Sequence, residues 1–413
     1  MNDVVRGLKS KYTAMFLDSS PAFPQFTHRF TSEEQRKAER EIESFIDETT
    51  SKMERSKKSG AGRAAEVEKL KASVKAFIAK SMCSPGKESE IDFLDDFSEV
   101  GDEFVRRARA FDPHLTMEDI HQALRNVWIV NSFQVFLGKD VALTPSGFAY
   151  SLLYPYTDNY LDDPTVRPET KADFVQALGR RLAGENVQAF IPAASRPFDL
   201  IEMIEEEYPR QNYPEVFGSL LAIHNAQVGA LAQQRSSRPL NAYDILDMSV
   251  GKGGTSVLAD AYVAAGILED TVEDFAFGFG VCLQLMDDLQ DFEEDLARGH
   301  QTLMTRTAVT GTLSALTNQL INFTASVIAS GGYNDSPQAQ ALLDLSHKSC
   351  LTLILEATAR ASDRYTEDYL TALEAYSPLR FSCLKSLKEN LKQKSKSLRR
   401  FESAISAGAF TGW

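Results

Sequence analysis

The chain has 413 residues, of which 43% are hydrophobic and 25% charged, and this composition is that of a folded globular protein rather than a disordered chain. With 44 Lys and Arg against 58 Asp and Glu the formal net charge is −14, which argues against a nucleic-acid partner because phosphates are normally met by a basic surface. Four cysteines, none in a CxxC pair, are too few for a disulfide framework and favour the reducing cytoplasm.

The N-terminal part of the sequence is charged and helical in character. Residues 1–7 lack a basic region followed by an apolar run, so we expect no signal peptide, and no stretch approaches the roughly 20 apolar residues of a membrane span. Residues 32–58 are charged helix formers, and residues 59–62 (SGAG) separate them from a second charged helix, which predicts a solvated helical hairpin. We therefore expect an N-terminal helical extension, residues 1–96, before a helical domain, residues 97–413.

The second part of the sequence has the pattern of a helical bundle. Apolar residues recur there at helical spacing, as in residues 120–130. The sequence has no alternating β-branched runs joined by hairpin turns, so nothing indicates a sheet. Breaks mark off helices long enough to cross a bundle, which predicts an all-α protein built around a single large bundle. These breaks are Pro145, Pro164, Pro209, Pro214, Pro239, Gly299 and Pro378.

A first group of acids lies in residues 154–164, YPYTDNYLDDP. On a helix Asp158 and Asp162 share one face and Asp163 stands at its edge. Pro164 ends the helix, because the residue before a proline prefers extended geometry. A surface turn is the alternative interpretation, since Asp-Asn-Tyr also suits a turn.

The strongest signal is the second group of acids in residues 284–299, QLMDDLQDFEEDLARG. On one continuous helix five charged residues would form a stripe, because residues three and four apart are neighbours. Like charges at that spacing destabilise a helix, so acids within an apolar segment require a compensating cation. Hard oxygen ligands select magnesium or calcium. A solvated acidic face, with the basic residue as its internal partner, is the alternative. The five residues are Asp287, Asp291, Glu294, Asp295 and Arg298.

Taken together, the two acid groups predict a specific kind of site. Acidic helices facing each other across a bundle could hold magnesium ions, which would bind a diphosphate as a leaving group. Loss of diphosphate from an allylic carbon leaves a carbocation, which needs an apolar, aromatic and water-free cavity. Aromatic residues such as Phe148, Tyr154 and Phe279 lie near both groups in the sequence, although they suit a core equally well.

These motifs resemble those of the class I isoprenoid synthases. The QxxDDxxD pattern of residues 284–291 resembles the second aspartate motif of trans-prenyl diphosphate synthases. In a shifted register, the DxxEDxxRG pattern of residues 291–299 resembles that of squalene and phytoene synthases. The DxxxD pattern of residues 158–162 resembles the first motif of this head-to-head group, and the mixture is also similar to bacterial large-terpene synthases. The resemblance extends over about residues 100–370.

The resemblance implies an isoprenoid-synthase-type bundle that binds Mg²⁺ and a prenyl diphosphate. Asn159 stands where a chain-elongating enzyme has an aspartate, which argues against simple elongation. Of the implied ligands, Asp158, Asp162, Asp287 and Asp291 would carry catalysis. The implied metal ligands are Asp158, Asp162, Asp163, Asp287, Asp288, Asp291 and Asp295.

The resemblance also implies residues that bind the diphosphate itself. Lys252 and Thr255 resemble the Lys-Thr break in a central helix of prenyl synthases, where a kink points polar groups at the diphosphate; glycines placed for close helix packing are the alternative. Two late arginines suit a bidentate phosphate clamp, although a surface ion pair explains either one alone. The full set is Lys252, Thr255, Arg298, Arg360, Arg364 and Tyr365.

Residues 379–400 carry eight basic residues, with leucines on one helical face. Such a helix could contact an anionic membrane from the cytoplasmic side, but packing of its apolar face on the bundle is the simpler interpretation.

The sequence as a whole predicts a cytoplasmic, Mg²⁺-dependent enzyme that ionises a prenyl diphosphate and forms a terpene or prenyl product. Two alternatives are a head-to-head prenyltransferase of the squalene and phytoene synthase type and a non-catalytic helical scaffold. A di-iron carboxylate bundle would need two Glu-x-x-His pairs, whereas the sequence has one, at Glu118 and His121.

Overall fold

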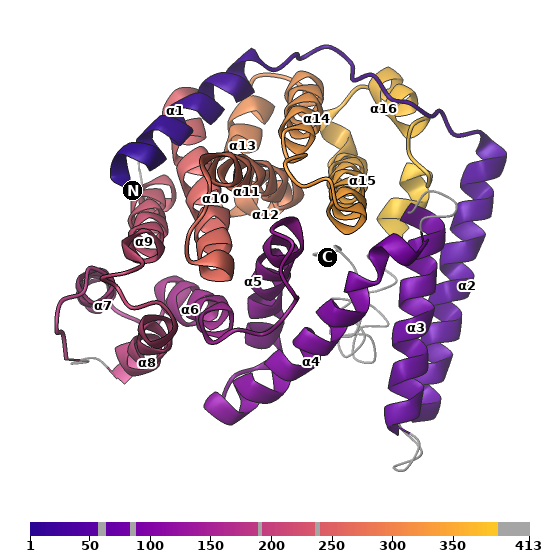
Figure 1. Cartoon of the computed structure of the whole chain (residues 1–413). Helices are drawn as coiled ribbons and strands as arrows, with labels where there is room; N and C mark the ends of the chain where they lie inside the picture. Colours follow the sequence, from indigo (N-terminus) through magenta and orange to yellow (C-terminus); the bar gives the residue numbers. More distant parts are fainter. Residues whose placement is uncertain (57–62, 83–87, 189–191, 236–239, 387–413) are drawn as a thin grey trace.

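The computed structural model describes residues 1–56, 63–82, 88–188, 192–235 and 240–386. Within these ranges the secondary structure is helical and contains no strand, which confirms the all-α prediction (Figure 1).

Two antiparallel helices, α10 (Ala242–Ala265) and α11 (Asp270–Gln290), form the centre of the bundle. Glycines let them approach closely, because a Cβ at Gly253 would collide with the backbone of Gly280 and a Cβ at Gly280 with that of Gly253. Helix α10 runs unbroken through the predicted Lys-Thr segment. The glycines of this segment therefore serve close helix packing rather than a break.

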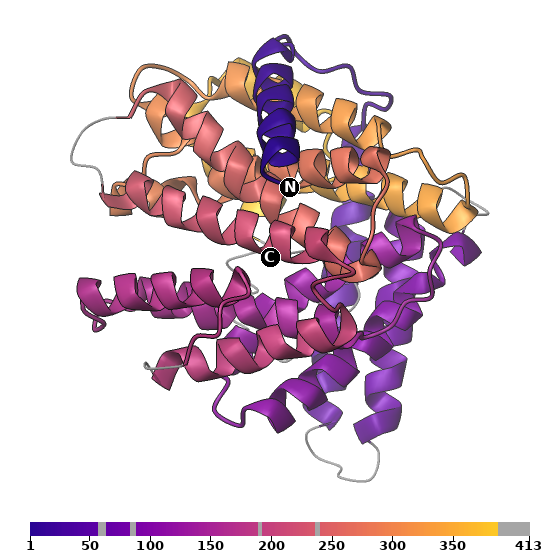
Figure 2. The ribbon, with the colours of Figure 1, turned by 60° about the vertical axis from the view of Figure 1, so that its left-hand side comes forward.

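Helices from both halves of the chain pack around this central pair (Figure 2). Helices α5 (Met117–Phe136), α6 (Pro145–Asp162) and α9 (Pro214–Arg235) pack against α10. Helices α14 (Ser314–Ala329) and α15 (Pro337–Arg360) pack against α11. The remaining helices of this part are α4 (Phe93–Phe111), α7 (Pro168–Leu182), α8 (Pro192–Glu207), α12 (Phe292–Arg298), α13 (Leu303–Ala308) and α16 (Glu367–Glu374), with the short 3-10 helices η1 (Glu88–Ile91) and η2 (Ser362–Arg364).

The N-terminal 96 residues divide into two parts with different surroundings. Helix α1 (Asn2–Asp18) packs against α10, α11 and α14, and it buries Tyr12 and Phe16 in the core of the bundle. The Tyr12 ring stacks on Phe277 with their centroids 5.9 Å apart. Helix α1 is therefore an integral part of the bundle that was predicted to begin at residue 97.

Helices α2 (Ser32–Ser56) and α3 (Arg63–Met82) form the predicted hairpin at one side of the bundle (Figure 1). Phe45 and Phe77 stack between them at 4.5 Å. At the inner end, the Lys75 ammonium lies 2.6 Å from a carboxylate oxygen of Asp95, which ties α3 to α4.

Helix boundaries follow the predicted breaks where a cap is present. Pro145 occupies the first turn of α6 after Thr144, whose hydroxyl accepts a hydrogen bond from the Gly147 N–H. Gly299 ends α12 with φ +72°, a conformation that favours glycine. Pro155 differs from this pattern because it lies inside α6, one turn before the first acid group.

Among the described helices, none combines the length and apolar character required to cross a bilayer. The predicted basic helix of residues 379–400 extends past residue 386 and so lies largely outside the described residues.

Candidate functional site

A cavity of about 550 Å³ lies beside α10 and α11, and α5, α6, α9, α12 and α15 contribute to its lining. It brings together residues of both predicted acid groups. Five of the seven predicted metal ligands line it: Asp158 from α6, Asp287 and Asp288 from α11, Asp291 between α11 and α12, and Asp295 from α12.

Tyr154, one turn before Asp158 on α6, connects the two acid groups electrostatically. Burial of its hydroxyl raises the pKa of Tyr154, and the charges of Asp158 and Asp287 raise it further. The Tyr154 hydroxyl also hydrogen-bonds the Asp158 carboxylate. Because carboxylates from α6 and α11 both act on this one hydroxyl, the first and second acid groups lie within electrostatic reach of each other.

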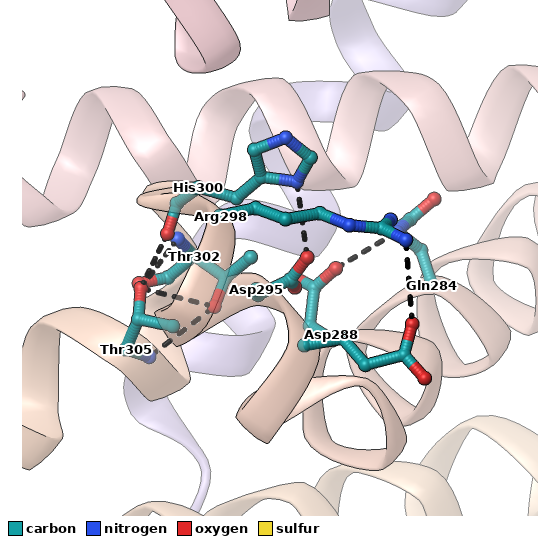
Figure 3. A network of polar contacts seen from close by, with 8 residues as sticks. Gln284, Asp288, Asp295, Arg298, His300, Thr302 and Thr305 are labelled. Atoms are coloured by element: carbon teal, nitrogen blue, oxygen red, sulfur yellow. Dashed lines mark hydrogen bonds and ion pairs between the residues drawn. The ribbon is translucent and has the colours of Figure 1, made fainter. Parts of the chain in front are cut away.

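Asp288 is the most deeply buried member of the second group, with 5% of its surface exposed. One carboxylate oxygen accepts a hydrogen bond from Gln284 Nε2 at 2.8 Å (Figure 3). The other accepts one from Ser249 Oγ at 3.1 Å. Burial, reinforced by the charge of Asp287, raises the pKa of Asp288 to about 7. Asp288 therefore joins α11 to α10, and both of its oxygens are already engaged.

The second acid group does not lie on one continuous helix, and that prediction is wrong at Asp291. Helix α11 ends at Gln290, whose carbonyl accepts a hydrogen bond from Arg360 Nη2 at 2.8 Å. A side chain that engages a helical carbonyl in this way bends the helix. The bonds from Asp291 N to Asp287 O and from Asp295 N to Asp291 O, each 2.8 Å, still keep these three acids one turn apart.

Beyond the bend, α12 presents Asp295 and Arg298 to the cavity. Burial raises the pKa of Asp295, and His300 Nδ1, 3.1 Å from its carboxylate, opposes this rise (Figure 3). Arg298 lies 3.6 Å from Glu294, and both side chains are two-thirds exposed. The solvated ion pair that was the alternative interpretation of this segment therefore describes Glu294, which does not line the cavity.

Three strongly basic side chains, Arg125, Lys252 and Arg298, line the cavity beside the acids. Sequence reasoning missed Arg125, which lies on α5 and lowers the pKa of Tyr154 by its charge. The available signal was the polar stripe of Gln122, Arg125 and Asn126, at helical spacing on an otherwise apolar helix.

Three predicted residues of α6 and α10 lie elsewhere or cannot be placed. The Asp163 carboxylate accepts hydrogen bonds from the Thr165 N–H at 2.8 Å and its hydroxyl at 2.7 Å, in the turn after α6. Thr255 donates its hydroxyl to the Gly251 carbonyl at 2.7 Å and does not line the cavity. The side chain of Asp162 lies outside the described part of the structure.

The predicted diphosphate clamp of the late helix is also not brought to the cavity. Arg360 contacts Glu356 at 2.6 Å besides the carbonyl at the end of α11. Arg364 forms an ion pair at 3.2 Å with the residue before it in the chain. The Tyr365 hydroxyl shares a 2.8 Å hydrogen bond with Thr317. The three side chains therefore make their contacts away from the cavity lining.

The acids have the chemistry of a magnesium site without forming a closed cage. In the described ranges, no three or more His, Cys, Asp or Glu side chains are grouped closely enough to hold a metal ion. Magnesium nevertheless suits carboxylates spread around a cavity, because it keeps part of its water shell and shares the rest with phosphate oxygens. Every acid donor here is a hard oxygen, so the residues fit Mg²⁺ bound together with a phosphorylated ligand.

Comparison with protein-family models, with curated proteins and with solved structures finds no match to this chain.

Proposed function

We propose that this protein is a Mg²⁺-dependent enzyme of the isoprenoid synthase type that ionises a prenyl diphosphate, releases diphosphate and forms a terpene or prenyl product. The cavity lined by both acid groups is the observation that carries the proposal. Along α11 its lining changes from Asp287 through Leu283 to Phe279. Along α10 it changes from Lys252 to Val257. A ligand with a charged head and a hydrocarbon chain matches this division.

The anionic head would meet both signs of charge at the polar end of the cavity. Bound Mg²⁺ would neutralise the diphosphate and stabilise it as a leaving group. Arg125, Lys252 and Arg298 supply N–H donors that bind phosphate oxygens directly. The carboxylates that would hold the metal are Asp158, Asp287, Asp291 and Asp295.

The apolar end of the cavity suits the hydrocarbon part of the ligand. Ionisation of an allylic diphosphate leaves a carbocation that water would capture, so the walls must exclude water. Trp128, Phe279 and Leu353 contribute such walls, and the aromatic faces of the first two attract a cation.

The proposal is tested by incubating the purified protein with Mg²⁺ and prenyl diphosphates of graded chain length. We expect metal-dependent release of diphosphate together with an extractable organic product. A product that contains two prenyl chains would identify the head-to-head reaction, whereas a product from one chain identifies a terpene synthase.

Two acids of the same segment provide a variant and its matched control. Asp291→Ala should abolish most of the diphosphate release, whereas Glu293→Ala, an exposed acid of α12 outside the cavity lining, should leave it unchanged. Absence of metal-dependent release with every chain length, from a folded protein, would favour the non-catalytic scaffold.

A further inference from the structure

Asp260 is a carboxyl group that the metal site does not use. It lies on α10, is 1% exposed and lines the same cavity as the acid groups. Within the part of the chain that the structure describes, its Oδ1 has no hydrogen-bond partner. Buried polar atoms in folded proteins are nearly always paired, so an unpaired carboxyl oxygen on a cavity wall indicates a partner that arrives with the ligand.

Asp260 lies at the end of the cavity opposite the acid groups. The α10 residues that line the cavity run from Ser249, which contacts Asp288, to Asp260. Asp260 follows Lys252 by eight residues, which is about 12 Å along a helix axis. Val257, one turn before it, lies in the apolar stretch of the lining.

The surroundings of Asp260 favour its neutral form. Burial raises the pKa of Asp260 well above its usual range. The charge of Asp260 raises the pKa of Tyr150, whose hydroxyl donates to the Ser256 carbonyl at 3.1 Å. A carboxylic acid in this state has both an O–H donor and an acceptor oxygen to offer.

We propose that Asp260 is a specificity-determining residue, which hydrogen-bonds an oxygen atom at the far end of the ligand's chain. The inference rests on the proposed function and deepens it: the cavity takes a diphosphate whose chain carries a hydroxyl or carbonyl group near its other end. A plain hydrocarbon end would leave the buried acid without a hydrogen-bond partner. A site built to hydrogen-bond an oxygen discriminates strongly against the analogue that lacks it.

The test uses pairs of saturated alkyl diphosphates that end either in a methyl or in a hydroxyl group. These compounds have no allylic bond to ionise, so binding is measured without turnover. In the presence of Mg²⁺, calorimetric titration over a series of chain lengths should show the hydroxyl-ended compound binding about tenfold more tightly at the best length, the gain of roughly one hydrogen bond. Asp260→Leu should remove this preference, and Asp260→Asn should retain part of it.

Equal dissociation constants for the two compounds at every length would overturn the inference, as would a preference that survives Asp260→Leu. Failure of both compounds to bind, while pyrophosphate with Mg²⁺ binds, would also overturn it. Equal binding of pyrophosphate by Asp260→Leu and the unmodified protein would show that the metal site is intact. If neither protein binds pyrophosphate with Mg²⁺, the proposed function itself is contradicted.

A structural role for Asp260 is distinguished by stability. Removal of an unpaired buried acid should raise the Tm of ligand-free Asp260→Leu, because no hydrogen bond is lost. A lower Tm in both Asp260→Leu and Asp260→Asn would instead assign Asp260 to the fold and overturn the inference.

Discussion

Asp291 is the residue on which the two overlapping acid motifs and the bend between α11 and α12 coincide. Asp291→Ala should lower the rate of diphosphate release by about 10²–10³-fold, the usual effect of losing one group that stabilises transition-state charge. The free energy of unfolding should change by less than about 0.5 kcal/mol, because the side chain is exposed. Steady-state release assays and urea unfolding check both values. Full turnover by Asp291→Ala would contradict the assignment.

Asp288 should behave differently because it is buried and its two oxygens are hydrogen-bonded. The pKa of Asp288 is about 7 in the folded protein, whereas that of an aspartate in an unfolded chain is near 4. The free energy of unfolding should therefore fall as pH rises from about 4 to 7, because the unfolded chain releases this proton more readily than the folded protein does. Asp288→Asn should therefore raise the free energy of unfolding at pH 8 by about 2–4 kcal/mol and change it little at pH 4. Urea unfolding in EDTA at the two pH values measures this. If Asp288→Asn instead lowers the free energy of unfolding at pH 8, the folded protein favours the ionised carboxylate of Asp288, which would contradict the prediction.

The sequence predicted the acidic residues of the cavity better than its basic residues. Carboxylates repeated at helical spacing leave a pattern, and five of them line the cavity. The arginines do not repeat along the sequence in this way, and a long side chain can reach several partners, so the position of an arginine alone does not predict what it contacts. Arg360 and Arg125 illustrate this: the first points at a backbone carbonyl of α11, and the second lines the cavity.

At the scale of elements, the glycines of α10 and α11 determine how closely the two central helices pack. Gly280→Ala should lower the free energy of unfolding by about 1–3 kcal/mol, because the added Cβ would collide with the Gly253 carbonyl. The matched control is Gly229→Ala on α9, which has open space around it and should raise the same quantity by about 0.5–1 kcal/mol. Thermal or urea unfolding of both variants decides the point. An unchanged free energy of unfolding in Gly280→Ala would mean that α10 and α11 can move apart without loss of stability.

Helix positions were largely predictable from spacing and caps, whereas their interruptions were not. Pro145 and Gly299 mark boundaries through local backbone chemistry, so the sequence reveals them. The end of α11 coincides instead with a contact from Arg360, seventy residues along the chain. Contacts between distant residues of this kind leave no signal in the local periodicity.

At the scale of the whole molecule, the cavity depends on segments that are far apart in the sequence. The first helix illustrates the limit of sequence reasoning. The charged helix formers of residues 32–58 suggested an extension over residues 1–96, and yet Tyr12 and Phe16 are buried against α11 and α14. Periodicity indicates that a helix has an apolar face but not what covers it. The all-α class was therefore predictable, whereas the division at residue 96 separates α1 from the bundle to which it belongs.

The response of the whole protein to ligand should reveal the coupling between metal and diphosphate. The carboxylates alone should hold Mg²⁺ weakly, since that ion gives up water reluctantly, and pyrophosphate alone should be repelled by Asp158, Asp287 and Asp291. Together each supplies the charge that the other lacks, so the rise in Tm with both should exceed the sum of the separate rises. A ligand that binds only the folded state stabilises by about 2.7 kcal/mol at a hundredfold excess over its dissociation constant.

Thermal unfolding with Mg²⁺, with pyrophosphate and with both measures this coupling, which must be reciprocal: each ligand should tighten the binding of the other by the same factor. The double variant Asp158→Asn, Asp291→Asn removes one carboxylate from each acid group, so its Tm shifts should become additive. The control Glu293→Ala should keep the synergy, because that exposed acid lies outside the cavity lining. Strict additivity in the unmodified protein would mean that the acids from α6 and α11 do not act on a shared ligand, however close to Tyr154 both of them lie.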